Sequence, residues 1–259
     1  MVFICLFIKV NLGKNLSTLY CGTEEFVNKS IGYKYFYMVT SMLVMRSTYY
    51  TAWKLSQASV NFTGLSYNKK LKTKDSEDSF DKIDSCNLKE IELNVNPRVR
   101  IQYWNRSVHL WLKYYVFLRL LNVNHKKFKN NKIVASLITF MISALWHGFY
   151  PVYFIFFFEY YMIEQVSTYL DEEFDLFNKI AEWNWLPKLL YRIFLMTLVN
   201  YFGLAFSILT LQANYNYYKA FYFVPLLSLF FAWVVTLTMP RKKKHRIEKI
   251  ENKTEEKNE

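Results

Sequence analysis

The chain has 259 residues, of which 53% are hydrophobic and 20% aromatic, and its formal net charge is +12. Length alone allows one or two soluble domains, but the apolar residues gather in stretches of about 20, the helix length that crosses a hydrocarbon core. Binding of nucleic acid would need a basic soluble face with exposed aromatic residues, and here the aromatic residues lie in the apolar stretches. The composition therefore indicates an all-α, polytopic membrane protein and excludes a nucleic-acid partner.

The N-terminal segment, residues 1–30, starts with the apolar stretch MVFICLFIKV, which is too short to span a bilayer. It lacks the basic start and the small-residue cleavage site of a signal peptide, so we interpret it as an interfacial anchor or a truncation remnant. The three cysteines, Cys5, Cys21 and Cys86, are scattered without metal-binding spacing. They predict neither a disulfide framework nor a zinc site.

Four apolar segments are predicted to span the membrane within a domain at 31–239. They are Tyr33–Trp53, Lys132–Tyr161 with a break near its middle, Lys188–Leu211 and Ala220–Met239. We expect a polar loop at 67–89 and a short lumenal loop at Gln212–Lys219. Residues 240–259 carry the basic run RKKKHR directly after Pro240 and lack apolar periodicity, which predicts a charged, largely disordered tail on the cytosolic side.

One further helix, Trp104–Leu121, is predicted to be amphipathic. Its apolar residues fall on one face of a regular helix: Val108, Trp111, Leu112, Tyr115 and Leu118. The charged residues Arg106, His109 and Lys113 share the opposite side. Such a helix lies in the membrane interface, lines a wet cavity or packs on neighbouring spans. Asn105 opens this helix, and its simplest role is that of an N-cap.

His147 stands at the end of a stripe of small, weakly polar residues in KIVASLITFMISALWH. The stripe contains Ala135, Ser136, Thr139, Ser143 and Ala144. A stripe of this kind turns towards other helices or a cavity, so His147 is expected to face inwards. Gly148 and Pro151 predict that the chain bends directly after it.

A histidine within a membrane segment has two readings. An intramembrane ionisable residue is costly and indicates a functional site, and the ordinary pKa of histidine, about 6.5, suits proton transfer. Alternatively, the ring of His147 only forms a hydrogen bond with a neighbouring helix.

At these residues the sequence resembles a known family. YWNRSVHLWLKYYVFLRL, followed by ITFMISALWHGFYPVYF, resembles the two signature regions of the membrane-bound O-acyltransferases, most closely the lysophospholipid acyltransferase branch. Ser47–Asn68 (STYYTAWKLSQASVNFTGLSYN) also resembles that branch, and the likeness extends roughly over 31–170. Gly148 follows the histidine where the sterol and diacylglycerol acyltransferase branch has a glutamate. Val152 departs from the pattern, because the branch usually has a second glycine there. The chain has about half of the family's usual length, as expected for a C-terminal half.

The resemblance implies that His147 is the catalytic histidine and Asn105 its polar partner. The implied reaction transfers an acyl group from acyl-CoA, a co-substrate, to the free hydroxyl of a lysophospholipid in the endoplasmic reticulum membrane. No further cofactor and no metal is expected. His147 would act as general base, and Asn105 would stabilise the oxyanion or position the acceptor. The expected substrate-binding residues are Trp104, Trp146, Tyr150 and Ser143; the aromatic ones are equally explained as interfacial residues.

Two other function classes compete with the enzyme. A truncated, non-catalytic membrane protein would bind lipid or partner helices while retaining the motif. A proton-coupled transporter would use His147 as a relay, but it would be expected to carry more intramembrane carboxylates than Glu159 and Glu164.

Overall fold

The computed structural model describes residues 2–13, 16–67, 80, 83–122 and 131–239. Every regular element in these ranges is a helix, which confirms the predicted all-α class. The predicted tail, 240–259, and most of the predicted polar loop, 67–89, lie outside the described residues. The last residues of that loop, from Leu88 on, belong instead to a short helix.

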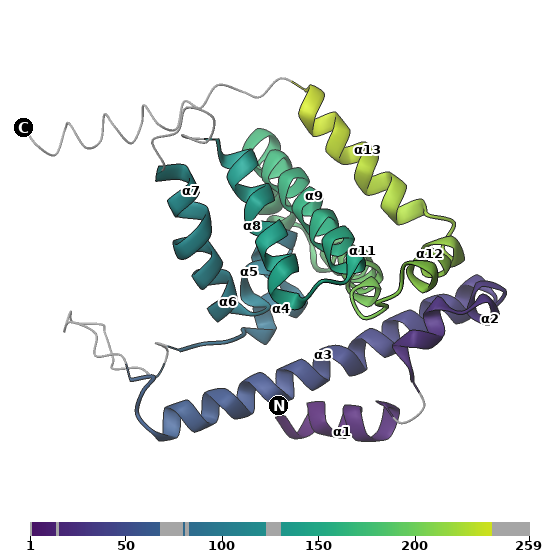
Figure 1. Cartoon of the computed structure of the whole chain (residues 1–259), viewed down its shortest axis with the longest axis horizontal. Coiled ribbons are helices and arrows are strands. Elements are labelled where there is room, and N and C mark those ends of the chain that lie inside the picture. The colour runs from purple at the N-terminus through teal and green to yellow at the C-terminus, as the bar shows by residue number, and fades with distance from the viewer. Residues whose placement is uncertain (1, 14–15, 68–79, 81–82, 123–130, 240–259) are drawn as a thin grey trace, which may run out of the picture.

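The N-terminal part of the chain packs along the longest helix of the fold (Figure 1). The elements are α1 (Val2–Leu12), the 3₁₀ helix η2 (Thr18–Gly22), α2 (Glu24–Val27) and α3 (Ile31–Phe62). The Ser30 hydroxyl caps α3 by accepting the N–H of Tyr33 at 3.4 Å. One face of α3 is buried: Lys34, Tyr37, Met38, Ser41, Met42, Arg46, Ser47, Tyr50 and Thr51. α1 runs beside α3, and α11 also packs against α3.

The predicted amphipathic helix is interrupted. The elements of this region are α4 (Leu88–Leu93), α5 (Pro97–Tyr103), α6 (Arg106–Leu112), the π-helical turn η3 (Lys113–Phe117) and α7 (Leu118–Asn122). A π-turn inserts an extra residue and rotates the next helical turns about the axis, so the prediction of one continuous apolar face is wrong. Trp111 and Tyr115 of that expected face are 45% and 57% exposed.

The predicted break after His147 is confirmed, because α8 (Lys132–His147) and α9 (Pro151–Phe174) are separate helices that pack together. Pro151 occupies the first turn of α9, where its missing N–H costs nothing. The small stripe of α8 turns inwards as predicted, with Ala135, Ser136, Ser143 and Ala144 buried. The hydroxyl of Ser136 lies 3.2 Å from a carboxylate oxygen of Glu164 on α9.

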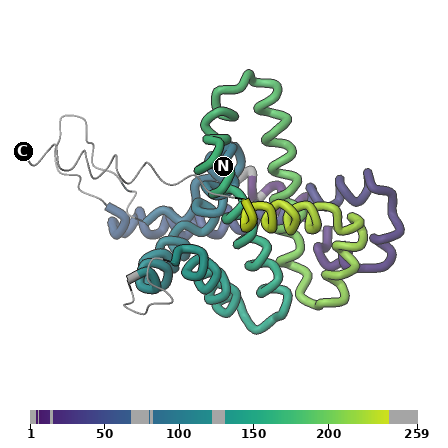
Figure 2. Tube along the Cα trace, turned by 90° about the horizontal axis from the view of Figure 1, so that it is seen from above, coloured from purple at the N-terminus to yellow at the C-terminus, as the bar shows by residue number. Residues whose placement is uncertain are grey.

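Four further helices complete the described chain: α10 (Leu176–Glu182), α11 (Trp185–Ala205), α12 (Leu211–Ala220) and α13 (Val224–Thr238). The prediction of a loop at Gln212–Lys219 is wrong, because these residues form most of α12. Tyr222 and Phe223 adopt left-handed backbone conformations between α12 and α13. The two helices consequently meet at an angle of 92°, a corner that is visible in Figures 1 and 2.

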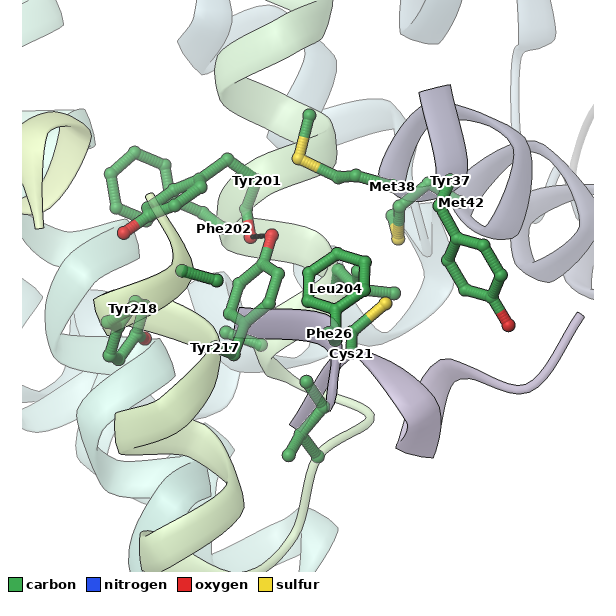
Figure 3. Close-up of a cluster of buried hydrophobic side chains, with 13 residues drawn as sticks. Cys21, Phe26, Tyr37, Met38, Met42, Tyr201, Phe202, Leu204, Tyr217 and Tyr218 are labelled. Carbon is green, nitrogen blue, oxygen red and sulfur yellow. Dashed lines mark hydrogen bonds between the residues drawn. The ribbon is translucent and has the colours of Figure 1, made fainter. Parts of the chain in front are cut away.

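The main core lies where α3, α11 and α12 meet the N-terminal segment (Figure 3). Figure 3 shows Tyr201, Phe202 and Leu204 facing Tyr217 from α12, whose hydroxyl donates to the carbonyl of Tyr201 at 2.9 Å. The N-terminal residues Cys21 and Phe26 are fully buried in the same cluster. Residues 16–27 therefore contribute side chains to this core. Gly22 lies so close to Ala213 that a Cβ atom there would be 2.6 Å from the Cβ of Ala213.

None of the described helices is by itself both long enough and apolar enough to cross a membrane. The predicted span Ala220–Met239 is shortened to the 15 residues of α13 by the corner before it. The pair α12 and α13 reaches the required length and apolarity only when taken together, and α8 is a shorter apolar helix. The predicted spans thus coincide with helices; Tyr33–Trp53 lies within the unbroken helix α3, but α3 is not apolar enough to count as a span by itself.

Candidate active site

His147 is the last residue of α8, and its imidazole is surrounded by aromatic rings. The ring centroids lie 4.6 Å from Trp146, 5.1 Å from Phe157, 5.1 Å from Phe206 and 5.7 Å from Tyr153. Trp146 and Phe206 approach edge to face, at 88° and 85°. The side chain therefore faces α9 and the end of α11, as expected from the stripe, but it remains exposed.

Within the described part of the chain, no hydrogen bond engages the imidazole of His147. No described hydrogen bond therefore supports the alternative reading, in which the ring only forms a hydrogen bond with a neighbouring helix. An exposed ring without a described hydrogen bond keeps both nitrogens available to an incoming hydroxyl. The aromatic surround fixes the ring without occupying its polar atoms.

The backbone beside His147 depends on glycine. Gly148 has φ +136° and ψ 176°, a conformation that L-residues rarely adopt. A Cβ atom at Gly148 would lie 3.6 Å from the rings of both Tyr150 and Tyr153. Tyr150 is 49% exposed and packs edge to face on Tyr153 at 5.7 Å. The turn thus places Tyr153 against the histidine, with Tyr150 packed on Tyr153.

Asn105 occupies the N-cap position of α6 but does not act as a side-chain cap. Its side chain makes no capping hydrogen bond, although its carbonyl accepts the N–H of His109 at 2.9 Å. The amide is half-buried. His109, which the pattern placed on a charged face, is also half-buried. Burial lowers the pKa of His109 to about 4, and repulsion from nearby cations, most strongly Lys113, adds to the effect. The imidazole of His109 is therefore neutral at pH 7.

Trp104 belongs to a cluster of rings contributed by α3. It lies 5.0 Å from Trp53, 5.6 Å from Tyr49 and 5.8 Å from Tyr50, each edge to face. Tyr49 also lies in the neighbourhood of Tyr153, whose ring packs against His147. The two motif regions therefore approach each other in the fold.

Asn105 and His147 are not themselves bonded: among the described residues no hydrogen bond joins them. Ser143 lies buried one turn before His147 in the packing of α8. Trp146 is 54% exposed beside the histidine. Of the expected site residues, Trp146 and Tyr150 accompany His147, whereas Trp104 accompanies Asn105.

Sequence reasoning missed Tyr49, Tyr153, Phe157 and Phe206. Tyr153 and Phe157 are four residues apart on α9, a spacing that places their rings on one face of the helix. That spacing could have indicated an aromatic face next to His147. Phe206 comes from the end of α11, and only the tertiary fold brings it to the histidine.

No cluster of three or more potential metal ligands occurs in the described ranges. An open groove of about 310 Å³ lies between α1 and α3, lined by Lys9, Val10, Gly13, Val44 and Thr48. None of these residues contacts the ring of His147, so the groove is not part of the candidate site.

Residues 7–209 match the membrane-bound O-acyltransferase family. The chain belongs to this family. The match includes Asn105, His147 and the helices that position them, and the members of this family are membrane proteins.

Three relatives of this membrane-bound O-acyltransferase carry related names. Lysophospholipid acyltransferase 6 of Drosophila melanogaster is 31% identical over 59% of this chain and 20% of its own length. The lysophospholipid acyltransferase of Schizosaccharomyces pombe is 28% identical over 78% of this chain and 40% of its own. Lysophospholipid acyltransferase 2 of Arabidopsis thaliana is 26% identical over 85% of this chain and 47% of its own length. The chain thus spans less than half the length of each of these relatives.

Proposed function

We propose that this protein transfers a fatty acyl group from acyl-CoA to the free hydroxyl of a lysophospholipid, with His147 as general base. The observation that carries the proposal is the imidazole of His147, exposed at the end of α8 and held by aromatic rings. The chain belongs to a family of O-acyltransferases, and it is similar to relatives that are named lysophospholipid acyltransferases.

The chemistry follows from the weak nucleophilicity of a glycerol hydroxyl. The imidazole of His147 takes the hydroxyl proton as the oxygen attacks the carbonyl carbon of the thioester. The carbon–sulfur bond then breaks, and the imidazolium returns the proton to the sulfur. The products are a phospholipid and free CoA, so the proton and the acyl group are both accounted for without a metal or a further cofactor.

Asn105 is proposed as the polar partner in this reaction. Its amide makes no capping bond and is half-buried, so its N–H donors are uncommitted within the described residues. A donor of this kind stabilises the developing oxyanion or holds the acceptor. In the proposed reaction, the reacting substrate atoms lie between Asn105 and His147.

The proposed setting is a multi-pass protein of the endoplasmic reticulum membrane with a cytosolic C-terminal tail. In such a setting both acyl chains remain in apolar surroundings while the reacting polar groups meet at His147. The exposed Trp146, Phe149 and Tyr150 form an apolar rim next to the histidine that suits an acyl chain.

The test is an acceptor panel in membranes that lack endogenous activity. Membranes with the full chain receive labelled acyl-CoA and, separately, lysophospholipids with different headgroups, a sterol and a diacylglycerol; membranes without the chain serve as the control. Label in phospholipid is the expected result. Label only in sterol ester or triacylglycerol, or no product from well-inserted protein, would reject the proposal.

A further inference from the structure

Three arginines from three different helices lie near one another, and one carboxylate pairs with them. Arg46 of α3 forms an ion pair with Glu92 of α4, with Nε and Oε1 3.0 Å apart. Arg100 of α5 interacts electrostatically with Glu92, with Arg46 and with Arg192 of α11. The group therefore combines three guanidinium charges with a single carboxylate, a net positive charge that an anion would balance.

Two of these guanidinium groups have buried nitrogen atoms without a partner. Arg100 is 3% exposed; its Nε donates to the carbonyl of Asn94 at 2.6 Å and its Nη1 to that of Ile91 at 2.8 Å. Its Nη2 and the Nε of Arg192 find no acceptor among the described residues. Burial lowers the pKa of Arg100 to about 10, so the group is still charged at neutral pH. An unpaired donor on a buried charge is costly and points to a missing acceptor.

The cluster reaches the surface and also borders the Trp104 rings. The side chain of Glu92 is 32% exposed, and Arg192 is half-buried, so a ligand has access from that side. The hydroxyl of Tyr50 donates to Glu92 at 2.7 Å, and the ring of Tyr50 packs on Trp104 at 5.8 Å. A single aromatic side chain thus separates the arginine cluster from the tryptophan that precedes Asn105.

We propose that Arg46, Arg100 and Arg192 form a binding site for a phosphate group of one of the substrates. Guanidinium groups suit phosphate because their planar donors pair with two of its oxygens. This proposal rests on the proposed function, since both of its substrates carry phosphate. The phosphate is either that of the lysophospholipid or one of those of CoA, and both present the same chemistry to the cluster.

The variant that isolates this role is Arg192→Gln. Arg100 also binds carbonyls at the end of α4, so its loss would disturb folding as well as ligand binding. The side chain of Arg192 makes no hydrogen bond within the described residues, and its replacement by glutamine removes the charge without breaking one. Lys179→Gln, an exposed cation on α10, is the matched control.

The experiment compares each substrate with an analogue that lacks phosphate. Initial rates give KM for acyl-CoA against S-acyl-pantetheine, and for lysophospholipid against monoacylglycerol. For Arg192→Gln we expect KM to rise roughly tenfold for one phosphate-bearing substrate, as for the loss of a charge-assisted hydrogen bond. KM for its phosphate-free analogue is expected to stay unchanged, as are both values in Lys179→Gln. The affected substrate identifies the source of the phosphate.

Unchanged KM values for both substrates, or equal losses with the phosphate-free analogues, would overturn the proposal. If the unaltered chain forms no product, the proposed function fails and the cluster is tested by thermal unfolding with CoA or with a lysophospholipid. Stabilisation of the unaltered chain that is absent in Arg192→Gln supports the phosphate site. Equal stabilisation of both proteins, or of neither, contradicts it.

Discussion

Gly148 shows how closely a single residue constrains the candidate site. Its φ of +136° lies where any side chain is strained, and the turn places Tyr153 against His147 and Tyr150 against Tyr153. Gly148→Ala is therefore expected to lower the free energy of unfolding by about 1–3 kcal/mol and to reduce acyl transfer. The measurements are thermal unfolding in detergent and the initial rate.

Gly32→Ala is the matched control for that change. Gly32 lies in the first turn of α3, and a Cβ atom there would meet nothing within 4 Å. Alanine should be neutral or stabilise the helix by about 0.5–1 kcal/mol. Equal behaviour of the two alanine variants would show that the turn after His147 is not under conformational constraint.

At the same scale, the sequence predicted the position of His147 on its helix but not its environment. The small stripe and the Gly148–Pro151 break were sufficient to place the histidine at a helix end facing α9. Phe206 and Tyr49 come from α11 and α3, and local periodicity carries no information about such tertiary partners. The arginine cluster was missed for the same reason, because Arg46, Arg100 and Arg192 lie far apart in the sequence.

At the scale of elements, α9 and α12 are joined by a buried polar contact. The hydroxyl of Tyr218 donates to Oε1 of Glu159 at 2.6 Å, and Glu159 is 1% exposed. Tyr218→Phe would leave this carboxyl without its described donor, so we expect a loss of about 1–3 kcal/mol in the free energy of unfolding. Tyr215→Phe, on the exposed side of α12, is the control and should be nearly neutral. Equal unfolding temperatures for the two variants would show that the contact contributes little.

Two element predictions failed for physical reasons. The polar residues of α12 suggested a loop. Asn214 and Asn216 are nevertheless buried, and their side-chain amides donate to the carbonyls of Ala205 and Gly22 at 2.9 and 3.1 Å. Buried amides that bond backbone carbonyls allow a polar segment to pack as a helix. The prediction of one amphipathic helix failed because a period of 3.6 residues assumes regular α-helical geometry. The π-turn at Lys113–Phe117 interrupts that geometry.

At the scale of the whole molecule, large apolar side chains remain exposed on the outer helices. On α11 and α13 they include Leu190, Ile193, Phe194, Leu227, Phe231 and Leu237. In a protein of a membrane-bound family, such faces are expected to contact lipid. The chain should therefore stay with the membrane pellet after alkaline carbonate extraction. Release of the folded chain into the supernatant would contradict the proposed multi-pass setting.

The central claim is that His147 carries the chemistry, and the most direct measurement is the rate of acyl transfer by His147→Ala. The ring makes no hydrogen bond among the described residues, so the substitution removes only its packing against the neighbouring aromatic rings, and the protein should remain folded. General base catalysis typically contributes 10²–10⁴-fold, so the rate should fall by at least about 100-fold relative to the unaltered chain. His245→Ala, in the basic run that starts the tail, should keep full activity. A His147→Ala protein that is folded, inserted and within a few-fold of the unaltered rate would contradict the account.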